Sequence, residues 1–80
     1  MVSELTPEMI SLAVNRLRAL ADDSRISIML SLQDAGEMGV NELAEKLGLN
    51  QPSTSKHLAV LKQAGIVGSR KAGTAASPWR

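Results

Sequence analysis

The feature that most constrains this fold is a three-residue turn, Gly48-Leu49-Asn50, between two stretches in which apolar residues recur at helical spacing. Gly48 stands where a helix ends in the left-handed conformation, and Asn50 is a strong cap for the helix that follows. Two short helices joined by a tight, glycine-containing turn predict a helix-turn-helix. An ordinary helical hairpin has the same pattern, so the turn alone leaves both alternatives open.

The two helices that flank this turn are expected to be short. Asn41 is a strong cap for the first of them, which has about seven or eight residues before Gly48 ends it. The second begins after Asn50 and ends at Ala64-Gly65, with Pro52 in its first turn. Its inward-facing residues, at helical spacing, are Thr54, Leu58 and Leu61.

Two further helices are predicted earlier in the chain. Thr6 caps the first, which has Pro7 at its first position and extends over about 15 residues. The second follows the cap-forming residues Asp22-Asp23-Ser24 and is apolar nearly all round, so we expect it to be the most buried helix. A loop is expected over 34–39. The first helix has one continuous apolar stripe, formed by Ile10, Ala13, Val14, Leu17, Leu20 and Ala21.

The size of the chain indicates that the fold needs additional stabilisation. A domain of 80 residues buries only about 60–70% of the surface that its unfolded chain exposes. The sequence contains no cysteine, which excludes disulfides and thiolate metal sites, so we expect a homodimer. Met9 and Leu12 lie off the apolar stripe of the first helix and are the candidate dimer contacts, with scattered surface exposure as the alternative.

Charge is divided unequally along the chain. Residues 1–50 contain all eight carboxylates and only four of the nine Lys and Arg residues. Residues 51–80 contain the other five basic residues and no acid. This separation is typical of a domain that meets a polyanion with one end, and a merely solvated basic tail is the alternative.

The outward side of the predicted fourth helix is polar and free of carboxylates. Gln side chains can pair with adenine, Lys with guanine, and Ser with base edges or phosphates, whereas an acid would repel the DNA backbone. A capped surface helix can also be rich in Ser, but the charge separation favours DNA. The candidate reading residues are Gln51, Ser53, Ser55, Lys56 and His57.

The residues after the fourth helix predict a short or incomplete β-hairpin. Ile66-Val67 is followed by a basic turn that contains glycine, which is typical of the first half of a β-hairpin. The returning stretch, 74–80, is interrupted by proline and poor in strand-forming residues. We therefore expect a DNA-binding domain over 1–71 and a wing remnant or flexible tail over 72–80. Trp79 is expected to lie free in this tail and not to dock on the domain.

Three groups of residues carry a specific resemblance. They are Leu20-Ala21-Asp22 with Arg25, Glu42-Leu43-Ala44 with Leu47-Gly48-Leu49, and Gln51-Pro52-Ser53 with Ser55-Lys56-His57-Leu58. Over roughly residues 10–71, the chain resembles the ArsR/SmtB-type winged helix-turn-helix transcriptional regulators. It differs from them in two elements, since the second wing strand and the helix that follows the wing are not recognised in the sequence.

The resemblance implies a mainly α fold with four helices and a β-wing. It also implies a homodimeric repressor that reads an inverted repeat in double-stranded DNA with the fourth helix. Arg70 and Lys71 would then be wing contacts to the DNA backbone. Thr54 stands where the family usually has an apolar residue, so its methyl group is expected to pack and its hydroxyl to bond back to the helix.

Several other functional classes are disfavoured. Relatives that sense soft metals often have Cys near the third helix, and none is present here; His57 is the single imidazole, so we expect no metal and no cofactor. An enzyme is disfavoured because the sequence has neither a phosphate-cradling glycine loop nor an acid next to His57. No stretch approaches the roughly 20 apolar residues of a membrane span, and the start lacks the features of a signal peptide, so we expect a cytoplasmic protein. The remaining alternative is a truncated interaction module that pairs with a full-length relative and modulates its DNA binding.

Overall fold

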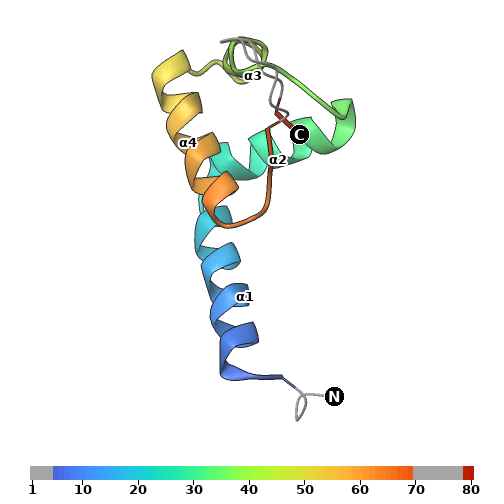
Figure 1. The fold of residues 1–80 in the computed structure, drawn as a ribbon. Coiled ribbons are helices and arrows are strands. Elements are labelled where there is room, and N and C mark those ends of the chain that lie inside the picture. The colour runs from blue at the N-terminus through green and yellow to red at the C-terminus, as the bar shows by residue number, and fades with distance from the viewer. Residues whose placement is uncertain (1–4, 70–78) are drawn as a thin grey trace.

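The structure is a computed structural model that describes residues 5–69 and 79–80. Four helices follow one another: α1 (Pro7–Leu20), α2 (Asp23–Ala35), α3 (Val40–Leu47) and α4 (Gln51–Gln63). Figure 1 shows α2, α3 and α4 grouped into one body, from which most of α1 projects. The predicted number and order of helices are confirmed, and the loop after α2 is shorter than expected because the helix continues to Ala35.

Local capping explains where the helices begin. The Thr6 hydroxyl accepts a hydrogen bond from the Met9 amide at 3.1 Å, and Asn50 Oδ1 accepts one from the Ser53 amide at 2.8 Å. Both caps are as predicted. The expected cap of α3 at Asn41 is wrong, because α3 begins at Val40 with Gly39 in the cap position. Glu42 Oε1 accepts a hydrogen bond from the Gly39 amide at 3.1 Å, and this favours the earlier start.

The turn between α3 and α4 has the predicted conformation. Gly48 has φ 67° and ψ 30°, the left-handed region in which an L side chain is strained. The Leu49 amide donates to the Ala44 carbonyl at 2.9 Å, which closes the end of α3. The chain thus reverses within a few residues, and α3 packs against α4 as in a helix-turn-helix.

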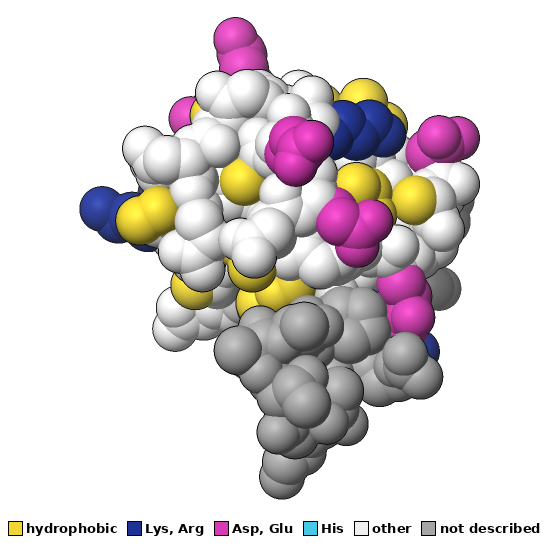
Figure 2. Space-filling model, turned by 90° about the horizontal axis from the view of Figure 1, so that it is seen from above, with side chains coloured by type: hydrophobic (Ala, Val, Ile, Leu, Met, Phe, Trp, Pro, Cys, Tyr) yellow, Lys and Arg dark blue, Asp and Glu magenta, His cyan; other side chains and the backbone are white. Residues whose placement is uncertain are grey.

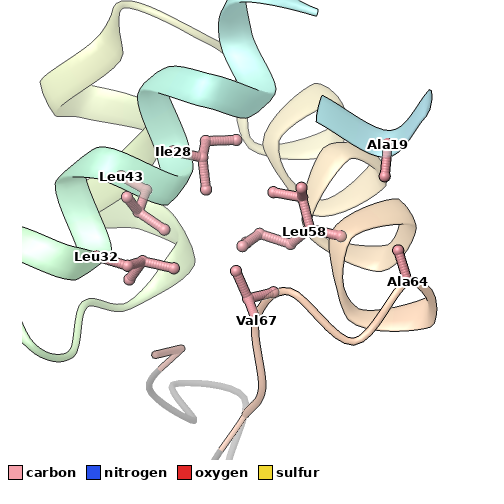
Figure 3. Close-up of a cluster of buried hydrophobic side chains, with 8 residues drawn as sticks. Ala19, Ile28, Leu32, Leu43, Leu58, Ala64 and Val67 are labelled. Carbon is pink, nitrogen blue, oxygen red and sulfur yellow. The ribbon is translucent and has the colours of Figure 1, made fainter. Parts of the chain in front are cut away.

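The core lies where α2, α3 and α4 meet. Figure 3 shows the side chains of Ile28, Leu43 and Leu58, which come from these three helices, around one common space closed by Val67. Leu58, Leu61 and Thr54 are fully buried, as the sequence predicts. The Thr54 hydroxyl donates to the Asn50 carbonyl at 2.9 Å, so burial of this polar group is compensated within α4.

Most of the apolar stripe predicted on α1 is exposed. Ile10, Val14 and Leu17, three members of that stripe, are 50%, 39% and 67% exposed. Only the end of α1 contacts the core, through buried Ala19 and half-buried Leu20. Helical spacing gives the direction in which an apolar stripe points, but not whether another element packs against it. Within the described chain, no other element packs against most of α1.

The prediction that α2 is buried on nearly all sides also needs correction. Ile28, Ser31 and Leu32 are buried, whereas Ile26 and Leu30 are exposed. With only four helices in the described chain, α2 is covered on one side by α3 and α4, and α1 contacts it only in part. The chain therefore has a second exposed apolar surface besides α1.

Trp79 is docked, contrary to the expectation of a free end. Its amide donates to the Met38 carbonyl at 2.7 Å, and the Met38 amide donates to the Trp79 carbonyl at 2.9 Å. Arg80 and Gly68 exchange a second pair of hydrogen bonds, at 2.6 and 2.8 Å. Poor strand-forming composition did not prevent pairing, because the backbone groups of Met38 and Gly68 supply hydrogen-bond partners for Trp79 and Arg80.

The indole of Trp79 also contacts the body of the domain. The ring is half-buried against the core, and Lys62 Nζ lies 5.8 Å from its centroid. The proposed division of the chain at residue 71 stays a prediction, because residues 70–78 lie outside the described part. Within residues 5–69, no helix is long and apolar enough to cross a membrane.

Candidate nucleic-acid interface

The first two turns of α4 bring the five candidate reading residues onto one short segment. Asn50 fixes the start of the helix, and the buried side chains of Thr54, Leu58 and Leu61 fix which side faces the core. The other positions of residues 51–57 contain no acid. The first turn of α4 likewise has no acidic residue. The segment therefore presents neutral and cationic groups at the positive end of a helix dipole.

The candidate residues differ in how exposed their side chains are to solvent. Gln51 and Lys56 are exposed, whereas Ser53, Ser55 and His57 are half-buried. Since residues four apart are neighbours on a helix, Ser53 and His57 line one flank, and Gln51 and Ser55 line the other. Lys56 stands between the flanks on the side opposite the core. Its long side chain is therefore the one best placed to enter a DNA groove.

His57 contacts an acid that the sequence analysis did not connect with it. His57 Nδ1 lies 4.0 Å from Asp22 Oδ2, and both side chains are partly exposed. The same Asp22 oxygen accepts the Arg25 amide at 3.1 Å and so caps α2. The two residues are far apart in sequence, and only the packing of α2 against α4 brings them together. His57 thus links the reading helix to the start of α2.

The face of the domain that includes α3 carries several acidic residues. Figure 2, viewed from above, shows several Asp and Glu side chains on this face and Lys or Arg at only a few points. Glu42 and Glu45 are exposed on α3. A polyanion that approached α3 squarely would meet these carboxylates, so the electrostatics favour contact through α4.

The predicted wing contacts, Arg70 and Lys71, lie outside the described residues. The segment just before them is described, and it brings a further cation into view. Lys62 Nζ donates to Ser69 Oγ at 3.3 Å. This hydrogen bond holds residues 66–69, the base of the wing, against the last turn of α4. Sequence reasoning gave Lys62 no role, because its partners at Ser69 and Trp79 are defined only by tertiary packing.

The candidate dimer contacts on α1 are accessible. Met9 and Leu12 are each about half exposed. They do not form a separate strip, because Ile10, Val14 and Leu17 are exposed as well. The apolar surface available for contact with another chain therefore extends around much of α1, beyond the two residues predicted.

Comparison with known protein families gives one match to this region. The pattern of the family described as "Bacterial regulatory protein, arsR family" matches residues 22–69. The chain is 46% identical over 70 residues to the HTH-type transcriptional regulator KmtR of Mycobacterium tuberculosis. It is 39% identical over 62 residues to the arsenical resistance operon repressor of Escherichia coli. These alignments cover 88% and 78% of this chain but only 53% of each relative.

Solved structures agree with the helix order. The homodimeric winged helix-turn-helix DNA-binding domain (fragment 1–100) from Mycobacterium bovis has a TM-score of 0.83 and 26% identity, covering 96% of this chain and 72% of that one. HlyU from Vibrio cholerae has a TM-score of 0.78 and 35% identity, covering 92% and 77%. The four helices and the turn between α3 and α4 therefore have the winged helix-turn-helix arrangement.

Proposed function

Because the chain belongs to the arsR family of bacterial regulatory proteins, we propose that it is a sequence-specific, double-stranded DNA-binding transcriptional regulator that acts as a repressor. The observation that carries this proposal is the acid-free, polar outer side of α4, whose opposite side is anchored in the core by Leu58 and Leu61. A rigid helix with such a surface suits the major groove. A cytoplasmic location belongs to the same proposal.

The residues of α4 have different roles in this proposal. Lys56 reaches a base edge from the centre of the outer side, and Gln51 contacts bases from the exposed first turn. Ser53 and Ser55 contact base edges or phosphates from the two flanks. His57 contacts the DNA backbone from a position beside Asp22, whose Oδ2 lies 4.0 Å from His57 Nδ1. Arg70 and Lys71 follow the wing base and contact phosphates outside the groove.

We propose that the active form is a homodimer joined through α1. The exposed apolar side chains of Met9 and Leu12 support this arrangement, as does the homodimeric state named for the Mycobacterium bovis domain. A dimer places two α4 helices in successive major grooves about one helical turn apart, which suits an inverted repeat.

Selection from a random double-stranded DNA library by the purified chain tests the function. At about 0.1 M salt, screening already weakens nonspecific electrostatic binding. We expect enrichment of an inverted repeat with half-sites about ten base pairs apart. Recovery of unselected sequences would contradict sequence-specific reading.

A second candidate function is supported by the exposed surface of α1. The chain could pair through α1 with another member of its family and alter that protein's DNA binding, as an interaction module. Adding the chain to a DNA-bound relative separates the two functions. An interaction module removes the relative from DNA and binds no DNA itself, whereas a regulator binds its own inverted repeat.

Introducing negative charge on α1 is expected to abolish dimerisation. In the double variant Met9→Glu/Leu12→Glu, four carboxylates would meet at the proposed interface, and burying unpaired charges is strongly unfavourable. Sedimentation equilibrium should show a dimer for the parent chain and a monomer for the variant. The matched control, Glu8→Gln, lies on the same helix and should remain dimeric. A dimeric double variant would exclude α1 as the interface.

Neutralising the wing is expected to change salt dependence more than base preference. The variant Arg70→Gln/Lys71→Gln removes four phosphate contacts from a dimer, which should reduce the slope of log affinity against log salt by about 3 to 4. Binding is measured on the selected DNA and on a scrambled duplex at several salt concentrations. Both duplexes should lose affinity to the same extent. An unchanged slope would mean that neither residue contacts the backbone.

A further inference from the structure

A cavity lies on the side of the domain where the end of α1, the start of α2 and the end of α4 meet. Its volume is about 310 Å³. Four polar side chains line it: Asn15, Arg18, Arg25 and Gln63. Val60 and Ala64 contribute apolar surface, and no carboxylate lines it. None of these residues belongs to the candidate DNA-binding set, so the cavity has no role in the function proposed above.

Arg25 is the unusual group of this cavity. Its Nε atom is buried and has no hydrogen-bond partner within the described residues. A buried donor on a charged group is costly when it is unpaired. Within residues 5–69 and 79–80, neither Arg25 nor Arg18 forms an ion pair with a carboxylate. Two guanidinium groups thus share one cavity, and no Asp or Glu is among its described lining residues.

We propose that this cavity binds a small organic anion through a carboxylate or phosphate group. A guanidinium presents parallel N–H donors that match two oxygens of such a group, and Nε of Arg25 is one of these donors. Arg18 supplies a second positive charge from α1. The volume is at the lower end of the range of about 300–1,000 Å³ for ligand pockets, so the ligand is a small metabolite.

The remaining lining residues fit a ligand with one anionic end. The amides of Asn15 and Gln63 can donate to or accept from its other polar groups. Val60 and Ala64 can contact its apolar part. Asn15, Arg18 and Gln63 are exposed, so the cavity is open to solvent and a ligand can enter without rearrangement of the core.

Titration of the full chain followed by NMR of the arginine side-chain N–H groups tests the proposal. The probes are sodium phosphate and sodium succinate, each compared with sodium chloride at equal ionic strength. We expect a saturable shift of the Arg25 Nε–H signal with at least one probe, and the probe that acts identifies the anion class. Arg16 lies on α1 outside the cavity, and its signal should not move. Equal shifts at both arginines, or none at Arg25, would overturn the proposal.

Variants separate a specific site from general charge attraction. Arg25→Lys keeps the charge but removes the planar donors, so the affinity for the active probe should fall roughly tenfold or more. Arg16→Lys is the matched control and should bind as the parent does. If circular dichroism shows that Arg25→Lys is unfolded, Arg18→Lys provides the same test from α1. Unchanged affinity in a folded cavity variant would overturn the proposal.

A carboxylate from a second copy of the chain is the competing occupant. The titration is therefore repeated over a hundredfold range of protein concentration. Anion binding that is the same throughout supports the cavity as a small-molecule site. Shifts of the Arg25 signal that follow protein concentration without any added anion would assign the cavity to the dimer interface instead.

Discussion

Replacing Lys56 by alanine is expected to weaken binding to the selected inverted repeat by about 2–6 kcal/mol. A well-placed base contact is worth about 1–3 kcal/mol, and a homodimer makes it twice. Lys56 is exposed on the side of α4 opposite buried Leu58, so its removal leaves the core intact. Affinity should fall about 30-fold or more. Base preference should relax at one position in each half-site, as measured by repeating the DNA selection.

Lys46→Ala is the matched control for this variant. It removes the same charge from an exposed position at the end of α3, beside Glu42 and Glu45. It should leave base preference unchanged and alter only the salt dependence, if anything. An equal loss for Lys56→Ala on every DNA sequence would make Lys56 a phosphate contact and transfer the reading role to Gln51 and the serines.

The second large effect concerns stability. Leu58→Ala is expected to lower the free energy of unfolding by about 2–5 kcal/mol, because the side chain is fully buried between α2, α3 and Val67 and its loss leaves a cavity. Such a loss is a large share of the stability of a small domain. Urea unfolding followed by circular dichroism measures it.

A surface leucine and a milder core variant complete this measurement. Leu17→Ala, on the exposed part of α1, should change stability by less than about 0.5 kcal/mol in the monomer. Leu58→Met keeps the volume and should cost less than about 1.5 kcal/mol, so it remains folded where Leu58→Ala does not. A cost for Leu17→Ala that grows with protein concentration would place Leu17 in the dimer interface.

Local interactions account for the parts of the fold that the sequence predicts well. The caps at Thr6 and Asn50, the left-handed Gly48 and the back-bonded Thr54 each involve residues within five positions of one another. All hydrogen-bond partners in these features are therefore local in sequence. The start of α3 was predicted two residues late because the Glu42 carboxylate favours Gly39 as the cap over Asn41, and both residues are acceptable caps.

Tertiary packing decides the features that the sequence does not predict. The exposed sides of α1 and α2 depend on which elements are present to cover them. The contact of His57 with Asp22 depends on how α2 crosses α4. Within the site, helical spacing predicts which side chains of α4 lie on the side opposite the core. It does not predict their different exposures, because the flanks of α4 are partly covered by its neighbours.

Docked Trp79 makes the domain easy to follow by intrinsic fluorescence. The sequence contains no Tyr or Phe, so this indole is its only strong ultraviolet chromophore and emitter. The ring lies half-buried beside Lys62, and its backbone pairs with Met38, so the emission reports on this one junction. Circular dichroism reports on the helices. If the two signals lose their native values at the same urea concentration, the junction and the helical core unfold as one cooperative unit.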